Sequence, residues 1–150
     1  MKRTGFTLVE ILIVVIILGI LAAIVIPQFT QASNDARTNA LASDLQTVRS
    51  QIQLFKVQHL DVAPGNSMAT ELTLRSNQGT GAQGSWTTAA LGADANTYPL
   101  GPYLQKFPTN AFAANNTVKI SATPGSGTEG WCYDPGTGSF WANDSAHSGM

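Results

Sequence analysis

The side chains able to perform chemistry are few and widely separated in this sequence. It contains one cysteine, Cys132, and two histidines, His59 and His147. Neither histidine stands in a pattern that pairs an acid with a nucleophile, so we expect both to be exposed to solvent. Cys132 has no second cysteine for a disulfide and no Cys or His neighbours at metal-ligand spacing, so it is interpreted as a small packing residue. These residues do not favour catalysis.

The charge balance argues against binding of duplex DNA through its phosphates. The 150 residues include 8 Lys and Arg residues against 9 Asp and Glu residues. No summed positive field is therefore available to attract a nucleic acid. A phosphate-binding loop is not indicated either, because the glycine-rich stretch 79–84 precedes no apolar helix.

One carboxylate, Glu10, is unusual because it lies in the most apolar part of the chain. A charge placed inside a membrane costs about 2.5–3.5 kcal/mol on insertion scales, so such a residue is a functional candidate that needs a partner. No Lys, Arg or His lies nearby in the same segment to serve as that partner. The alternative is that Glu10 only reaches the membrane surface.

The segment that carries Glu10 is long enough to cross a membrane. Every residue from Ile11 to Ile26 is Ile, Leu, Val, Ala or Gly, and about 20 such residues span a bilayer. Lys2 and Arg3 precede the run, which predicts a cytoplasmic N-terminus and an exported remainder. The run is longer than the apolar region of a cleaved secretory signal.

The apolar run continues without a break into an amphipathic pattern, which predicts one helix from residue 6 to about 58, roughly 80 Å long. Its apolar stripe recurs mostly at steps of three and four residues: Ala36, Ala40, Leu41, Leu45, Val48, Ile52 and Phe55. Gly19 and Pro27 weaken the helix, so the stretch between them is expected to bend or melt. Alternatively, Pro27 marks the membrane exit.

The remainder of the chain is expected to form a loop-rich domain that covers this stripe. The breaker at residues 63–66 ends the helix near His59. Residues 68–74 are predicted to form a short helix or strand, and residues 77–85 a flexible loop.

A hairpin is predicted near the end of the sequence. Residues 117–123 and 130–133 have the composition of short strands, and the turn at residues 134–138 joins the second strand to residues 139–141. Cross-strand aromatic pairs would stabilise such a sheet. We interpret four aromatic residues as core rather than as a sugar-binding platform: Trp131, Tyr133, Phe140 and Trp141.

The run Gly5-Phe6-Thr7-Leu8-Val9-Glu10, preceded by Lys2 and Arg3, closely resembles the class III signal of the type IV pilin and pseudopilin superfamily. The resemblance implies an α+β, pilin-like fold, in which the second half of a long N-terminal helix packs on a small antiparallel sheet. It also implies three parts: a leader, residues 1–5; a transmembrane and filament-core half-helix, residues 6–29; and a globular domain, residues 30–150.

The same resemblance implies how the N-terminus is processed. A prepilin peptidase would cut between Gly5 and Phe6 and then methylate the new amine of Phe6. The ammonium of Phe6 in a neighbouring subunit would then be the missing partner of Glu10. Since burying either charge unpaired is costly, this pair would select the stagger between subunits.

The resemblance also implies partners and a location. The partners would be copies of the same chain in a helical filament, an assembly ATPase with platform proteins, and minor pilins or pseudopilins. The chain would cross the bacterial inner membrane once, with a cytoplasmic N-terminus and a periplasmic globular domain. A structural role without enzymatic activity follows. A membrane-anchored enzyme or ligand-binding module is the alternative of a different class.

The segment Gly101–Asn110 resembles the middle of major pseudopilins of type II secretion systems. Those proteins carry a calcium site in a C-terminal loop, and Asp134, Asn143 and Asp144 offer oxygen atoms of the kind calcium accepts. The alternative is that these residues are solvated turn residues and that no cofactor is bound. Because Cys132 is alone, the two-cysteine loop of many type IV pilins is missing, which favours a pseudopilin. A type IV pilin for adhesion, twitching motility or DNA uptake is the alternative.

Overall fold

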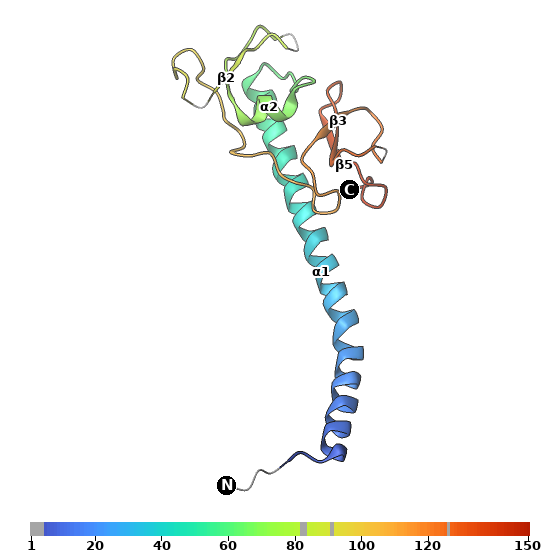
Figure 1. Cartoon of the computed structure of the whole chain (residues 1–150). Coiled ribbons are helices and arrows are strands. Elements are labelled where there is room, and N and C mark those ends of the chain that lie inside the picture. The colour runs from blue at the N-terminus through green and yellow to red at the C-terminus, as the bar shows by residue number, and fades with distance from the viewer. Residues whose placement is uncertain (1–4, 82–83, 91, 126) are drawn as a thin grey trace. The chain divides into compact units, whose positions relative to one another are not determined.

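The computed structural model describes residues 5–81, 84–90, 92–125 and 127–150. Their contacts divide the chain into two compact units, Met1–Thr38 and Asn39–Met150. The longest element is helix α1, Leu8–Gln58 (Figure 1). The predicted long helix is confirmed, with its start at Leu8 in place of Phe6. The division into residues 1–5, 6–29 and 30–150 stays a prediction, because it concerns processing and membrane exit.

Helix α1 ends where two consecutive residues take a left-handed backbone. Leu60 and Asp61 have φ angles of 59° and 65°, which a right-handed helix does not allow. The Asp61 amide donates to the Lys56 carbonyl at 2.8 Å, and the His59 amide donates to the Phe55 carbonyl at 2.9 Å. These bonds satisfy carbonyl groups of the last turn. The expected end near His59 is confirmed.

In the second unit, α1 contributes one apolar stripe to the core. Its buried residues follow one another at intervals of three or four: Leu41, Leu45, Val48, Ile52 and Phe55. This spacing places them on one face of the helix, and fully burying such a side chain contributes about 1.5–3 kcal/mol. The stripe was expected to begin at Ala36. Ala36 and Ala40 are exposed, so burial begins at Leu41.

A short helix and a two-stranded sheet follow α1. Helix α2, Met68–Thr73, occupies the predicted short element and buries Met68 and Leu72. Strands β1, Arg75–Ser76, and β2, Thr88–Ala89, pair antiparallel. The predicted loop 77–85 lies between them. Its residues 82 and 83 lie outside the described part of the chain, and its flexibility stays a prediction.

A second sheet contains β3, Val118–Ile120, β4, Trp131–Asp134, and β5, Ser139–Ala142, in that order. Strands β4 and β5 form the predicted antiparallel hairpin. Strand β3 runs parallel to β4, so this sheet is mixed, whereas the pairs β1–β2 and β4–β5 are antiparallel as predicted. The connection 121–130 explains the difference, because it is long enough to return the chain to the other end of β3 before β4 begins.

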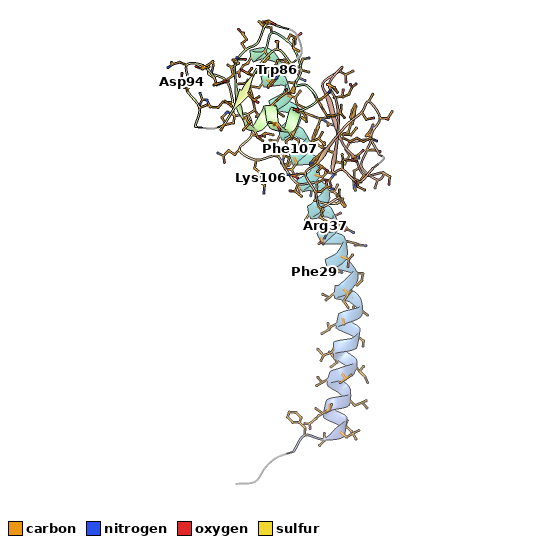
Figure 2. The ribbon with its side chains drawn as sticks, turned by 45° about the horizontal axis from the view of Figure 1, so that its top comes forward. Phe29, Arg37, Trp86, Asp94, Lys106 and Phe107 are labelled. Carbon is orange, nitrogen blue, oxygen red and sulfur yellow. The ribbon has the colours of Figure 1, made fainter. Side chains whose placement is uncertain are left out.

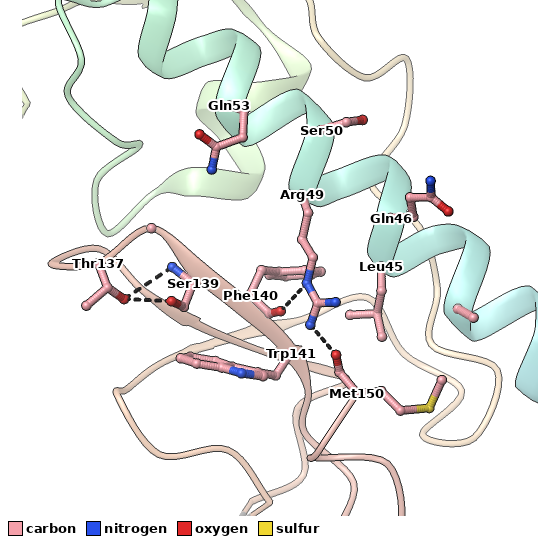
Figure 3. Close-up of a pocket in the computed structure, with 12 residues that line it drawn as sticks. Leu45, Gln46, Arg49, Ser50, Gln53, Thr137, Ser139, Phe140, Trp141 and Met150 are labelled. Carbon is pink, nitrogen blue, oxygen red and sulfur yellow. Dashed lines mark hydrogen bonds between the residues drawn. The ribbon is translucent and has the colours of Figure 1, made fainter.

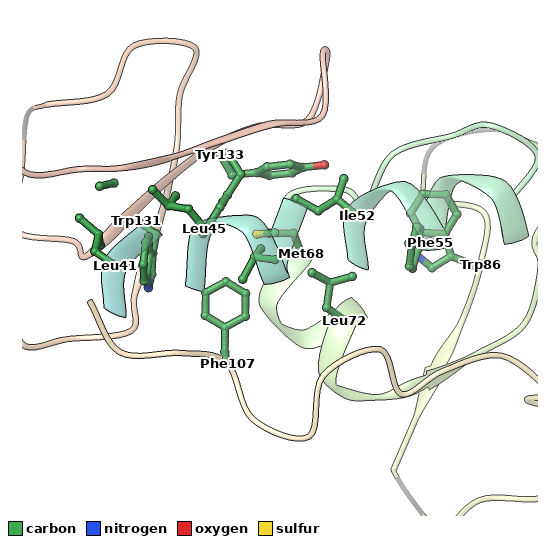
Figure 4. Packing of buried hydrophobic residues seen from close by; sticks show 13 residues of the cluster. Leu41, Leu45, Ile52, Phe55, Met68, Leu72, Trp86, Phe107, Trp131 and Tyr133 are labelled. Carbon is green, nitrogen blue, oxygen red and sulfur yellow. The ribbon is translucent and has the colours of Figure 1, made fainter. Parts of the chain in front are cut away.

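The core of the second unit joins α1, α2 and the three-stranded sheet (Figure 4). Trp131 and Tyr133 are fully buried and Phe140 is 1% exposed, which confirms these three as core. The Trp131 indole donates to the Pro108 carbonyl at 3.0 Å, and the Tyr133 hydroxyl donates to the Pro64 carbonyl at 2.7 Å. Trp141 was wrongly placed in the core, since it is only half-buried and lies outside the cluster.

The segment 101–110 crosses the same core. The amides of Tyr103 and Leu104 both donate to the Leu72 carbonyl at 2.9 Å. Phe107 is buried, and the Asn110 carboxamide donates to the Gly130 carbonyl at 2.7 Å. These contacts tie the segment to α2 and to the residue before β4.

Candidate processing and assembly site

The start of α1 is closed by hydrogen bonds between Thr7 and Glu10. The amide and the hydroxyl of Thr7 each donate to Oε2 of Glu10 at 2.8 Å, and the Glu10 amide lies 3.3 Å from the Thr7 hydroxyl oxygen, which accepts from it. This is a capping box, in which the residue before the helix and the third helical residue satisfy each other's backbone donors. A cap of this kind stabilises a helix by about 0.5–2 kcal/mol.

The capping box gives Glu10 a partner that the sequence interpretation missed. The expected partner was a cation, whereas the observed partner is the backbone and side chain of Thr7. The signal was present in the run Thr7-Leu8-Val9-Glu10, because Ser or Thr followed three residues later by Glu is typical of a helix start. Only Oε2 of Glu10 has a hydrogen bond among the described residues.

The peptide bond between Gly5 and Phe6 is accessible. Residues 5–7 belong to no helix or strand, and Phe6 is 81% exposed. A Cβ added to Gly5 would meet no atom within 4 Å, so the chain's own packing does not require glycine at this position. Lys2 and Arg3 lie outside the described residues.

The first unit exposes apolar side chains all around α1. The large hydrophobic residues from Ile11 to Ile26 are 51% to 64% exposed, and Phe29 is 77% exposed. Figure 2 shows these side chains standing away from the helix as far as the labelled Phe29. Among the described residues, α1 is the one helix long and apolar enough to cross a membrane.

The two residues expected to weaken α1 do not interrupt it. Pro27 lies inside the helix, and an added Cβ at Gly19 would meet no atom within 4 Å. The Thr30 hydroxyl donates to the Ile26 carbonyl at 3.1 Å, one residue before Pro27. The helix is therefore unbroken in the free chain, and melting during assembly stays a prediction.

The candidate calcium ligands lie at two different ends of the β4–β5 hairpin. Asp134 is at the turn, where its carboxylate accepts from the Gly136 amide and the Thr137 hydroxyl, both at 2.9 Å. Asn143 and Asp144 follow β5 at the opposite end. The structure therefore keeps Asp134 apart from Asn143 and Asp144, and its carboxylate stabilises the turn.

A further carboxylate, Glu129, which was not identified from the sequence, lies at the end of the hairpin where Asn143 and Asp144 lie. The Asn143 amide donates to the Gly130 carbonyl, and its carboxamide donates to the Glu129 carbonyl at 3.2 Å. Oε2 of Glu129 and Oδ2 of Asp144 are buried and have no hydrogen-bond partner among the residues that the structure describes. Among the described residues no three His, Cys, Asp or Glu side chains form a metal group. The two unpaired oxygens are carboxylate oxygens, which are ligands that a hard cation such as calcium accepts together with backbone carbonyl groups.

Both histidines were wrongly expected to be exposed. His59 is fully buried, with Nδ1 2.9 Å from the Phe55 carbonyl and Nε2 3.1 Å from the Ser76 hydroxyl. Burial lowers the pKa of His59 below its ordinary value. His147 is half-buried against Phe112 and contacts the Asp144 carboxylate. The burial of both histidines depends on tertiary contacts, which the residue type alone does not predict.

Cys132 is fully buried, as a packing residue would be. Its Sγ donates to the Ser121 carbonyl at 3.2 Å. Burial raises the pKa of the Cys132 thiol, which disfavours the reactive thiolate form.

Residues 1–26 match the family model described as the prokaryotic N-terminal methylation motif. Type II secretion system core protein G of Pseudomonas aeruginosa is 29% identical over 85 residues, which cover 57% of this chain and 59% of that protein. The protein of the same name from Klebsiella pneumoniae is 25% identical over 114 residues, which cover 76% of this chain and 72% of that protein.

The type IV narrow pilus major component PilA5 of Thermus thermophilus is 29% identical over 106 residues, 67% of this chain and 88% of that protein. The chain spans 59% and 38% of core protein G from Pseudomonas aeruginosa and from Dickeya chrysanthemi. No solved structure is significantly similar to it. The resemblance seen in Gly5 to Glu10 is confirmed: the chain carries a prokaryotic N-terminal methylation motif and is related in sequence to type II secretion core protein G and to a type IV pilin.

Proposed function

We propose that this protein is a subunit of a filament assembled at the inner membrane, of the pseudopilin type that supports type II secretion. The observation that carries the proposal is the exposed apolar surface of α1 from Ile11 to Ile26. An exposed apolar surface of this extent is typical of a site that contacts a membrane or another protein. Lipid covers it before assembly, and the same helix of other copies covers it in the filament.

The names of the relatives support the choice between filament types. Core protein G of type II secretion systems is similar to this chain in several organisms. The similarity to PilA5 supports the second candidate, a type IV pilin. Deleting the chain distinguishes them, because loss of exoenzyme secretion indicates a pseudopilin and loss of surface fibres indicates a pilin.

The accessible bond between Gly5 and Phe6 is the proposed cleavage point of a prepilin peptidase, and the Phe6 amine is the proposed methylation site. After the cut, Glu10 can hold Thr7 through Oε2 and receive the Phe6 ammonium of a neighbouring copy through Oε1. Pairing these charges in an apolar filament core fixes the stagger between copies more than it adds stability.

Two substitutions separate cleavage from assembly. In Gly5→Leu the chain has room for the new side chain, so its fold is expected to persist while the leader stays attached. In Glu10→Ala the leader is expected to be removed, but filaments are expected to be sparse because the Phe6 ammonium loses its carboxylate. Mass spectrometry of membrane protein and electron microscopy of filaments measure the two outcomes.

Each variant can contradict one part of the proposal. A normally trimmed Gly5→Leu product would remove the peptidase assignment. Normal filaments from Glu10→Ala would remove the proposed pair between Glu10 and Phe6. Glu10→Gln is the matched control, because it keeps a hydrogen-bonding oxygen for Thr7 and loses only the charge, so it too should assemble poorly.

We also propose that Glu129 and Asp144, together with backbone carbonyl groups, hold a calcium ion. The ion would connect the segment before β4, which contains Glu129, to the segment after β5, which contains Asp144. Calcium is expected to raise the midpoint of thermal unfolding, and Glu129→Gln is expected to remove that rise because it replaces a charged oxygen ligand. Asp134→Asn is the matched control and should keep the rise. Equal responses to calcium in all three chains would contradict these ligands.

A further inference from the structure

The second unit contains an open groove between α1 and the β4–β5 hairpin, with a volume of about 820 Å³ (Figure 3). Helix α1 lines one side with Gln46, Ser50 and Gln53, and the hairpin lines the other with Ser139 and Trp141. The volume lies within the range of ligand-binding clefts. All of these lining residues belong to the second unit.

The groove has one charged lining residue, Arg49, and its guanidinium is already used by the protein. Nε of Arg49 donates to the Phe140 carbonyl at 2.9 Å, and Nη2 donates to the Met150 carbonyl. Arg49 therefore holds the hairpin and the segment after it against α1. Among the described residues the lining contains no Asp, Glu or Lys, so it favours an uncharged ligand.

Several polar groups in the groove lack a protein partner. The carboxamides of Gln46 and Gln53 are exposed, the Trp141 indole is half-buried, and none of the three has a hydrogen bond within the described part of the chain. The hydroxyl oxygens of Thr137 and Ser139, in contrast, lie 2.9 Å apart and share a hydrogen bond. The groove thus offers free amide and indole groups beside a fixed pair of hydroxyls.

We propose that this groove binds a neutral carbohydrate chain. A carboxamide both donates and accepts, so the two Gln side chains match sugar hydroxyl groups, which do the same. The indole of Trp141 offers a flat apolar face for a sugar ring and an N–H for one of its oxygens. This role accounts for the position of Trp141 outside the core.

An extended peptide fits the same groove less well. A peptide that adds a strand to β5 needs free backbone groups along the outer edge of that strand. The carbonyl of Phe140 on that edge is occupied by Arg49. The carbohydrate proposal goes beyond filament assembly and does not depend on it.

The test uses the full chain, purified in a detergent without a sugar headgroup. Its three tryptophans give three indole N–H signals in NMR spectra, and Trp141→Phe identifies the signal of Trp141. The probes are neutral chito-, cello- and malto-oligosaccharides and an anionic oligogalacturonate. We expect at least one neutral oligosaccharide to shift the Trp141 signal while the signals of Trp86 and Trp131 stay in place.

Variants then locate the binding. Trp141→Ala and Gln53→Ala are each expected to weaken binding about tenfold or more, as loss of a stacking or hydrogen-bonding partner does. For Trp141→Ala, which removes the reporting signal, calorimetry measures the affinity. Gln51→Ala, on α1 outside the groove lining, should bind normally. Unchanged signals of Trp86 and Trp131 verify that each variant is folded.

Three results would overturn the proposal. The first is a Trp141 signal that no neutral oligosaccharide moves. The second is an equal response to oligogalacturonate, which would indicate an anion site at Arg49. The third is a Trp141 signal that moves with protein concentration and not with sugar, because that result would assign the groove to a second copy of the chain.

Discussion

At the scale of single residues, His59 is a buried titratable group whose ring nitrogens form hydrogen bonds to uncharged groups. The His59 ring stacks on Phe55 with centroids 3.7 Å apart and lies edge-on to Trp86 at 5.3 Å. Ser76 and Tyr103 also lie beside the ring. The only ion pair near the end of α1, among the described residues, is Lys56 with Asp61. None of these four side chains beside the ring is acidic, and among the described residues no carboxylate forms an ion pair with His59.

We therefore expect the second unit to lose stability as the pH falls below about 6.5. Burial lowers the pKa of His59 in the folded chain from its ordinary value of 6.5, so the unfolded chain takes up this proton first. The stability that neutral His59 contributes is fully present above the pKa of His59 in the unfolded chain. It decreases as the pH falls toward the pKa of His59 in the folded chain. Thermal unfolding followed by tryptophan fluorescence at pH 7.5 and pH 5.5 measures the loss.

A variant of His59 tests whether this pH dependence comes from His59. His59→Phe keeps the ring stack and removes the proton, so its unfolding midpoint should change less between the two pH values. The parent chain, measured at the same two pH values, is the reference. The explanation would be wrong if His59→Phe lost as much stability at pH 5.5 as the parent chain does.

The residues singled out in the structure could be predicted from the sequence to different degrees. Gly5, Phe6 and Glu10 form a contiguous pattern, so the sequence located them. The Thr7–Glu10 bond was also readable, because a capping box depends on a spacing of three residues. Glu129 and His59 were not, because their partners Asn143 and Ser76 are far away in sequence and only the tertiary fold brings them together.

At the scale of elements, α1 joins two kinds of surface in one helix. Up to Phe29 it exposes apolar side chains, and from Leu41 it buries one stripe and exposes the opposite face. The stripe was predictable because a period of three or four residues is local. The hairpin was predictable because the turn 134–138 is local too. The parallel pairing of β3 with β4 was not, because it depends on the path of the connection 121–130.

Two leucines of α1 provide a matched pair for measuring the stripe. Leu45 is 2% exposed, whereas Leu54 is 44% exposed. Leu45→Ala is expected to destabilise the second unit by about 2–5 kcal/mol through lost burial and the remaining cavity. Leu54→Ala should cost less than about 1 kcal/mol. Urea unfolding followed by tryptophan fluorescence compares them, and equal costs would contradict the assignment of Leu45 to the core.

At the scale of the whole molecule, the two units suit different surroundings. Met1–Thr38 exposes an apolar helix, whereas Asn39–Met150 encloses a core of its own. The second unit has an apolar cluster drawn from α1, α2 and both strands of the hairpin. Its stability therefore should not depend on the membrane.

Removing residues 1–27 is expected to give a soluble monomer. The deletion takes away the apolar run up to Pro27 and leaves the stripe that begins at Leu41 with its core. Size-exclusion chromatography with light scattering measures the mass, and the full chain in detergent serves as the reference. Large oligomers of the shortened chain would place the assembly contacts in the second unit.

The capping box at Thr7 and Glu10 has a consequence for the electrical state of the processed chain. The proposed cut lies before Phe6, outside the hydrogen bonds that begin α1, so the helix keeps its shape when the leader is removed. What changes is that an amide becomes an ammonium next to the positive end of the helix dipole, where a cation is unfavourable. The new ammonium is therefore unfavourable at this end of the helix unless a carboxylate lies beside it. A carboxylate supplied by another copy would meet that condition.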